Sequence, residues 1–326
     1  MTTMTMAKAL NEGLRRALES DRHVLMLGED IGKLGGVFRV TDGLQKDFGE
    51  DRVIDAPLAE SAIVGTSVGL AMRGYRTVVE IQFDGFVYPA FDQIVSQAAK
   101  LHKRSAGAYT MGLVIRLPFQ GGIGAVEHHS ESPEAYFVHT AGLRVVACST
   151  PNDAYWMIQQ AVAHDDPVIF CEPKCRYWDR GEVDLDHPPA GLFDAVVRRP
   201  GRDVTVVAYG SMVKVALQAA EAAAEEGRDL EVIDLRGLSP MDLDTVAASV
   251  ERTGRLLVIQ EAPPVASVGS EVVAAIQERC FYSLRAPATR VSAFYVPYPA
   301  SKIEDEFRPS VDRVLWTLDQ LMEHDS

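Results

Sequence analysis

Short apolar runs alternate along the chain with longer stretches in which apolar residues recur every three to four positions. In the first half, β-branched runs of strand length occupy residues 24–27, 77–83, 113–117, 143–147 and 168–171. Segments with the length and apolar recurrence of helices lie between them, at residues 59–72, 89–104 and 153–164. Because buried parallel strands have nearly continuous apolar sequences, this alternation predicts a parallel sheet with helices on both faces. Asn152 and Asp153 stand where the N-cap of the last helix is expected.

The pattern breaks between residues 175 and 202, where prolines and glycines interrupt a stretch with little periodicity. We expect the domain boundary there, with a first domain at residues 1–187 and a second at 188–326. Strands are predicted in the second domain at 204–208, 230–234, 256–260 and 290–294, and helices at 212–226, 243–252, 270–280 and 309–322. The predicted fold class is α/β, with two parallel-sheet domains.

Composition and charge exclude several classes of protein. The 326 residues suffice for two domains with separate cores, and 47% hydrophobic with 24% charged residues is ordinary for a globular protein. The net charge of −14 argues against a nucleic-acid partner and permits a basic protein partner. No apolar run approaches the roughly 18 residues of a membrane span, and the N-terminus lacks a secretory signal. We expect no membrane association, and a location in the bacterial cytoplasm or an organelle matrix.

Generic site motifs are few. The four cysteines do not form pairs at zinc-ligand spacing, so we expect reduced thiols and no metal ligands. The glycines at 32–36 form neither a phosphate-binding loop nor a dinucleotide fingerprint. The turn at 121–124 is predicted to be flexible and able to approach a ligand closely.

Five motifs in a fixed order are more specific. They are APLAES at 56–61, EIQFDGF at 80–86 with PAFDQ at 89–93, HHSESPEAYF at 128–137, PVIF at 167–170 with EPK at 172–174, and EVIDLR at 231–236. Together they resemble the beta subunits of the thiamine-diphosphate-dependent decarboxylases of 2-oxo acid dehydrogenase complexes. The resemblance covers nearly the whole chain. It implies a transketolase-like pyrimidine-binding domain followed by a transketolase-like C-terminal domain.

The resemblance also implies roles for individual residues. Glu60 would hydrogen-bond the aminopyrimidine ring of thiamine diphosphate and favour its imino tautomer, and Leu58 in the same motif would contact the cofactor. The alternative for Glu60 is an ordinary first-turn glutamate, favoured by the helix dipole. Phe86 would stack on the aminopyrimidine, with core packing as its alternative, whereas Phe83 is predicted to be core.

His129 matches the family's histidine that precedes a serine, which handles protons and guides the lipoyl dithiolane during reductive acylation. A pKa in the neutral range suits imidazole to that work. Its neighbour His128 is expected at the surface or beside the site. The catalytic candidates are therefore Glu60 and His129.

The motif that holds magnesium and diphosphate in the family, glycine-aspartate-glycine, does not occur in this chain. The resemblance then implies that a separate alpha subunit holds the magnesium, in an α2β2 heterotetramer with contact to a second beta subunit. A lipoyl acyltransferase core is the further partner implied. The family's potassium site includes the region ahead of Pro167. His164 departs there from the acidic or basic residue of many members, which argues against potassium binding.

Substrate and catalytic competence leave alternatives open. The EPK motif at 172–174 and the ERCF segment at 278–281 favour a branched-chain 2-oxo acid over pyruvate or acetoin. A non-catalytic scaffold subunit is the alternative from a different class, and the joint presence of Glu60, Phe86 and His129 argues against it. A self-sufficient transketolase-like enzyme would need the missing magnesium motif.

Overall fold

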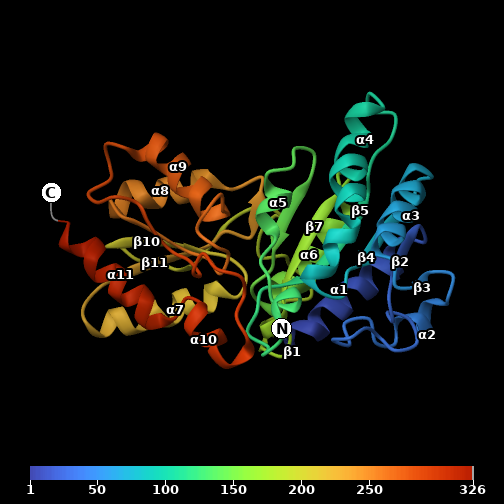
Figure 1. Ribbon diagram of the computed structural model, residues 1–326, viewed down its shortest axis with the longest axis horizontal. Helices are drawn as coiled ribbons and strands as arrows, with labels where there is room; N and C mark the ends of the chain where they lie inside the picture. The colour runs from blue at the N-terminus through green and yellow to red at the C-terminus, as the bar shows by residue number, and fades with distance from the viewer. Residues whose placement is uncertain (325–326) are drawn as a thin grey trace.

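The computed structural model describes residues 1–324 and contains two α/β units side by side (Figure 1). The first is built on a seven-stranded sheet with the order β12-β6-β7-β5-β4-β2-β3. Its strands are β2 (Val24–Gly28), β3 (Val53–Asp55), β4 (Arg76–Glu80), β5 (Leu113–Phe119), β6 (Arg144–Ala147), β7 (Val168–Pro173) and β12 (Gly237–Ser239). All neighbours pair in parallel except β12, which is antiparallel to β6.

Helices cover both faces of this sheet. One face is covered by α1 (Met6–Ser20) and α6 (Pro151–Ala163), which pack against each other. The opposite face is covered by α3 (Glu60–Met72), the 3₁₀ segment η1 (Asp84–Ala90), the π-helical segment η2 (Gln93–Ala98) with α4 (Ala99–Arg104), and α5 (Glu134–Val138). The N-cap prediction for α6 was wrong, because Thr150 caps the helix and its hydroxyl accepts from Asp153 N.

The second unit has a five-stranded sheet with the order β14-β13-β10-β11-β9. Its strands are β9 (Val196–Arg199), β10 (Val204–Ala208), β11 (Leu230–Asp234), β13 (Leu256–Ile259) and β14 (Thr289–Val291). One face is covered by α7 (Met212–Glu225) and α11 (Val311–Glu323), and the other by α8 (Leu243–Thr253) and α9 (Val268–Cys280). The parallel strands and four helices predicted for this unit are confirmed, with ends that differ by a few residues.

Short elements complete the described chain. They are α2 (Leu44–Phe48), the two-stranded pair β1 (Thr2–Thr5) and β8 (Arg180–Val183), the 3₁₀ segments η3 (Glu127–His129), η4 (Lys174–Arg176) and η5 (Ser301–Ile303), and α10 (Glu304–Phe307). The stretch with little periodicity therefore contains β8 and β9. In residues 1–324, no helix is both long and apolar enough to cross a bilayer.

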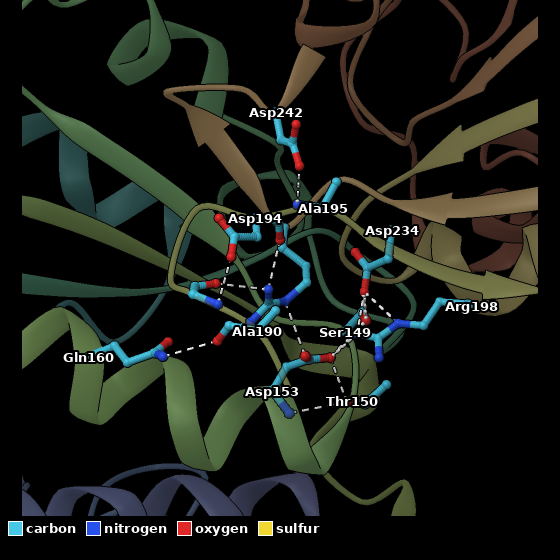
Figure 2. Close-up of polar contacts among 12 residues, drawn as sticks. Ser149, Thr150, Asp153, Gln160, Ala190, Asp194, Ala195, Arg198, Asp234 and Asp242 are labelled. Carbon is cyan, nitrogen blue, oxygen red and sulfur yellow. Dashed lines mark hydrogen bonds and ion pairs between the residues drawn. The ribbon is translucent and has the colours of Figure 1, made fainter. Parts of the chain in front are cut away.

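Two buried features join the units. A single hydrophobic cluster runs from the first sheet through α3 and α5 into β10, β11, α8 and α9. Beside it lies an ionic cluster (Figure 2) in which Arg198 donates to Asp234 over 2.7 Å and also pairs with Asp153 at the start of α6. Asp153 is within 3.1 Å of Arg236 as well. Both Asp153 and Arg236 are fully buried, so the units are joined by paired charges as well as by apolar contact.

Candidate active site

Four side chains that can take part in catalysis or bind a ligand lie just after the carboxyl ends of four neighbouring strands. Glu29 follows β2, Glu60 begins α3 after β3, Phe86 lies in η1 after β4, and His129 lies in η3 after β5. These strands are adjacent in the order β5-β4-β2-β3, and α3 packs against η1, which packs against η3. Ligands of open parallel sheets bind at this edge.

Glu60 is buried although it begins a helix, with only 7% of its side chain exposed. A first-turn glutamate that merely complements the helix dipole normally stays in water. Leu58, two residues earlier, is 79% exposed. The APLAES motif therefore buries the Glu60 carboxylate and exposes the Leu58 side chain. This reverses the usual arrangement, in which charged groups face water and leucine is buried.

Glu29 is a site residue that the sequence analysis missed. It is 8% exposed, and its Oε1 has no hydrogen-bond partner within the described chain. Burial and then the nearby charges of Glu60 and Asp30 raise the pKa of Glu29. The available signal was its position directly after the buried strand 24–28. Two buried carboxyl groups close to each other are typical of a site that holds or transfers a proton.

Aromatic rings connect Phe86 to His129. The Phe86 ring lies 5.1 Å from the His129 ring, edge to face, and also packs against the hydrophobic core. Phe83 was predicted to be core, but it is half-buried, lies 4.1 Å from His129 and contacts Phe38 and Phe86. The structure therefore brings Phe86 and His129 together and adds Phe83 to them.

The surroundings of His129 favour a neutral ring. Burial, followed by the positive charges of His128 and Lys174, lowers the pKa of His129. Nδ1 of His129 is buried without a hydrogen-bond partner in the described chain. His128 is exposed, as expected. A neutral imidazole can accept a proton at neutral pH, as a general base requires.

The Asp84-Gly85 pair of the second motif holds η1 against the histidine segment. Asp84 forms a fully buried ion pair with Lys174 of the EPK motif, and its Oδ2 accepts from Glu131 N over 2.6 Å. A Cβ on Gly85 would lie 2.4 Å from the carbonyl oxygen of His128. Only glycine permits this approach.

A second buried network of charged side chains links strands β4, β5 and β7 near the site. Arg116 on β5 donates to both oxygens of Glu172 on β7, over 2.7 and 2.8 Å, and pairs with Glu80 on β4. Tyr177 donates to Glu172 over 2.6 Å. Arg116 and Glu172 are completely buried. Paired charges without access to water hold one geometry, so the carboxyl ends of these strands are kept in register.

Comparisons with known proteins decide the family. Residues 2–178 match the transketolase pyrimidine-binding domain and residues 194–314 match the transketolase C-terminal domain. A protein from Leifsonia xyli subsp. xyli, named pyruvate dehydrogenase E1 component subunit beta, is 61% identical over 98% of this chain and 94% of its own length. The chain belongs to the beta subunits of 2-oxo acid dehydrogenase E1 components.

Other relatives of this beta subunit carry both substrate names. The 3-methyl-2-oxobutanoate dehydrogenase subunit beta of Mycobacterium tuberculosis is 51% identical over 98% of the chain and 92% of its own length. The pyruvate dehydrogenase E1 component subunit beta of Bacillus subtilis is 44% identical over 99% of the chain and all of its own length. A solved structure titled "Split gene transketolase, inactive beta4 tetramer" has a TM-score of 0.78 at 19% identity, covering 99% of both chains, and shows the fold.

The transketolase-like domains and the relatives place this beta subunit in a thiamine-diphosphate-dependent family. The residues present suit that group. Glu29 Oε1 and His129 Nδ1 are buried polar atoms without partners in the described chain, as expected where a polar ligand supplies the missing hydrogen bonds. Phe86 offers a ring next to His129, and Leu58 offers an exposed apolar side chain two residues before Glu60.

Proposed function

We propose that this beta subunit supplies the aminopyrimidine half of a thiamine diphosphate site and works there with an alpha subunit. The reaction is the oxidative decarboxylation of a 2-oxo acid, with reductive acylation of lipoyl groups. The burial of Glu60 at the carboxyl edge of the sheet, where Glu29, Phe86 and His129 also lie, is the observation that carries the proposal.

Each residue has one task. Thiamine diphosphate, held by Glu60, Phe86 and Leu58, would supply the carbanion chemistry that decarboxylation of a 2-oxo acid requires. The Glu60 carboxyl group holds a proton at the aminopyrimidine ring nitrogen. Phe86 and Leu58 pack on the ring and orient it. His129, with its lowered pKa, takes or gives a proton as the lipoyl dithiolane is acylated.

The other half of the site belongs to the alpha subunit in this proposal. No glycine-aspartate-glycine occurs in the chain, so the magnesium and the diphosphate are assigned to alpha. An α2β2 heterotetramer follows, with a contact between two beta subunits. The net charge of −14 is compatible with docking to a basic module of the lipoyl acyltransferase core.

Potassium is not part of the proposal. The Arg76 guanidinium donates to the carbonyl oxygens of Val162 and His164 over 3.1 and 2.9 Å, and pairs with Asp165 over 2.7 Å. These carbonyl groups lie in the region ahead of Pro167, and they already accept hydrogen bonds from the positively charged Arg76 side chain. The thermal unfolding midpoint should be the same in potassium and sodium salts of equal ionic strength. Stabilisation by potassium alone would contradict this.

The test is co-expression with the alpha subunit and assay of pyruvate and 3-methyl-2-oxobutanoate side by side. Activity in the co-purified complex, and none in the isolated chain, is expected. The more active acid assigns the substrate. Assembly without activity on either acid would favour the scaffold alternative. Activity of the isolated chain with thiamine diphosphate and magnesium would favour a self-sufficient enzyme.

A further inference from the structure

The segment that carries His129 is a closed loop. Residues 120–131 form most of the connection between β5 and α5, and the backbone N–H of Gln120 donates to the carbonyl of Glu131 over 2.9 Å, so the two ends of this loop meet. At the second end, Glu131 N donates to Asp84 and the Tyr88 hydroxyl donates to the Glu131 side chain over 2.7 Å. These anchors belong to the first domain.

The other side of the loop is held by the second domain. Gly121 N donates to Glu261 Oε1 over 2.6 Å. Gly122 N and Gly124 N donate to the two oxygens of Glu304 over 2.5 and 3.0 Å. Glu261 follows β13 by two residues and Glu304 begins α10. Hydrogen bonds to an ionised carboxylate are roughly twice as strong as neutral ones, so these contacts define where the glycines lie.

Both carboxylates are themselves held in place. The Tyr298 hydroxyl donates to Glu304 over 2.6 Å, and Arg308 and the Ser211 hydroxyl each donate to Glu261 over 3.1 Å. Burial opposes the charge of Glu304, but the hydrogen bonds from Tyr298 and from the two glycine N–H groups lower its pKa. Glu304 is therefore an anion at neutral pH.

The glycines are required by this contact. A Cβ on Gly121 would lie 1.8 Å from the hydroxyl oxygen of Tyr298. Gly122 has φ +87°, and its Cβ would lie 2.5 Å from the Arg308 guanidinium. The turn at 121–124 was predicted to be flexible, whereas the structure shows it clamped against the second domain.

We propose that Glu304, assisted by Glu261, is a positioning residue of the half-site: the second domain clamps the glycine turn and thereby fixes where His129 stands. The inference rests on the proposed function of His129. It assigns the second domain a part in building the active site. The side-chain hydrogen bonds of Glu304 within residues 1–324 go to the glycine turn and to Tyr298, so its loss should affect acyl transfer to lipoyl groups rather than decarboxylation.

The test compares Glu304→Gln with Glu306→Gln in the co-purified complex. Glu306 lies on the same short helix and is exposed, so this control makes the same chemical change without touching the loop. In Glu304→Gln, amide hydrogen exchange at residues 121–129 should become about tenfold faster, because the amide side chain cannot accept two charge-assisted hydrogen bonds. Lipoyl-dependent turnover should fall at least about tenfold, while decarboxylation with an artificial electron acceptor changes less than about twofold.

Unchanged exchange, or an equal loss of both activities, would overturn the inference. If Glu304→Gln fails to assemble, Tyr298→Phe is the substitute variant, because it removes one hydrogen bond to Glu304 and leaves the glycine contacts. Its amide exchange and lipoyl-dependent turnover should change in the same direction, but less. His129→Ala is measured in parallel. A selective loss in His129→Ala without one in Glu304→Gln rejects only the inference. Equal effects of His129→Ala on both activities reject the proposed role of His129.

Discussion

Asp153 and Arg236 lie 3.1 Å apart, both without solvent exposure, although one begins α6 of the first domain and the other ends the EVIDLR motif of the second. Arg236 also donates to the carbonyl oxygens of Gly191 and Asp194, over 3.0 and 2.7 Å. Arg236 therefore contacts the connecting segment through hydrogen bonds and the first domain through its ion pair with Asp153.

Asp153→Asn is therefore expected to lower the thermal unfolding midpoint of the complex. Removing one partner of a buried ion pair leaves the other charge without compensation, which costs about 3–5 kcal/mol. Arg202→Gln is the control, because Arg202 is 87% exposed in its pair with Asp229 and exposed pairs contribute little. Asp153 also pairs with Arg198, so equal midpoints for the two variants would show that the ion pairs of Asp153 do not stabilise the domain contact.

Glu60→Gln should abolish decarboxylation while the complex still assembles, because an amide cannot exchange a proton with the aminopyrimidine. The control is Glu271→Gln, which changes another first-turn glutamate, on α9, that is exposed. Steady-state assays and the mass of the complex check both points. If Glu60→Gln keeps its activity, the remaining explanation is that Glu60 is an ordinary first-turn glutamate, favoured by the helix dipole.

Phe86→Leu should weaken the binding of thiamine diphosphate two- to tenfold, the effect of losing an aromatic stack of about 0.5–1.5 kcal/mol. Phe86→Tyr keeps the ring and should bind as the unchanged protein does. Titration of the complex with the cofactor measures both constants. If leucine and tyrosine variants bind equally well, Phe86 acts only in core packing.

His128→Gln should move the acid limb of lipoyl-dependent turnover to higher pH. Burial is the first cause that lowers the pKa of His129, and the charge of His128 is the second. Removing the His128 charge should therefore raise the pKa of His129. His129 would then be protonated, and unable to act as a base, up to a higher pH. His187→Gln, at a side chain 82% exposed, is the control. The pH profile of turnover is the measurement, and an unmoved limb would argue against His129 as the titrating group.

Glu134 predicts a pH dependence of stability. Its side chain is fully buried, and burial raises its pKa from 4.5 to about 7 although the Tyr209 hydroxyl donates to it over 2.6 Å. A raised carboxyl pKa means that the folded state retains its proton. The native state therefore loses stability as pH rises from 4.5 to about 7, by roughly 3 kcal/mol. Glu134→Gln should remove this slope in denaturant titrations at pH 5 and pH 8. A slope equal to that of the unchanged protein would contradict it.

The sequence predicted secondary structure correctly where the residues of a single helix or strand are enough to determine it. β10 and β11 have the predicted bounds of 204–208 and 230–234, because buried strands leave continuous β-branched runs. The helix α1 was not predicted, although Thr5 caps it. Glu29 was not predicted either: its position directly after the apolar run 24–28 was the only local signal, and that position alone does not show that the carboxyl group lies near Glu60.

Apolar periodicity determined the class of fold, and the ordered motifs determined the family, because both are written in neighbouring residues along the chain. Only the tertiary structure decided how distant groups meet. It places β12 beside β6 in the first sheet, buries Asp153 against Arg236, and brings Glu304 to the glycine turn that carries His129. Such contacts depend on how the two domains pack together, and no local pattern encodes the distance between residues more than eighty positions apart.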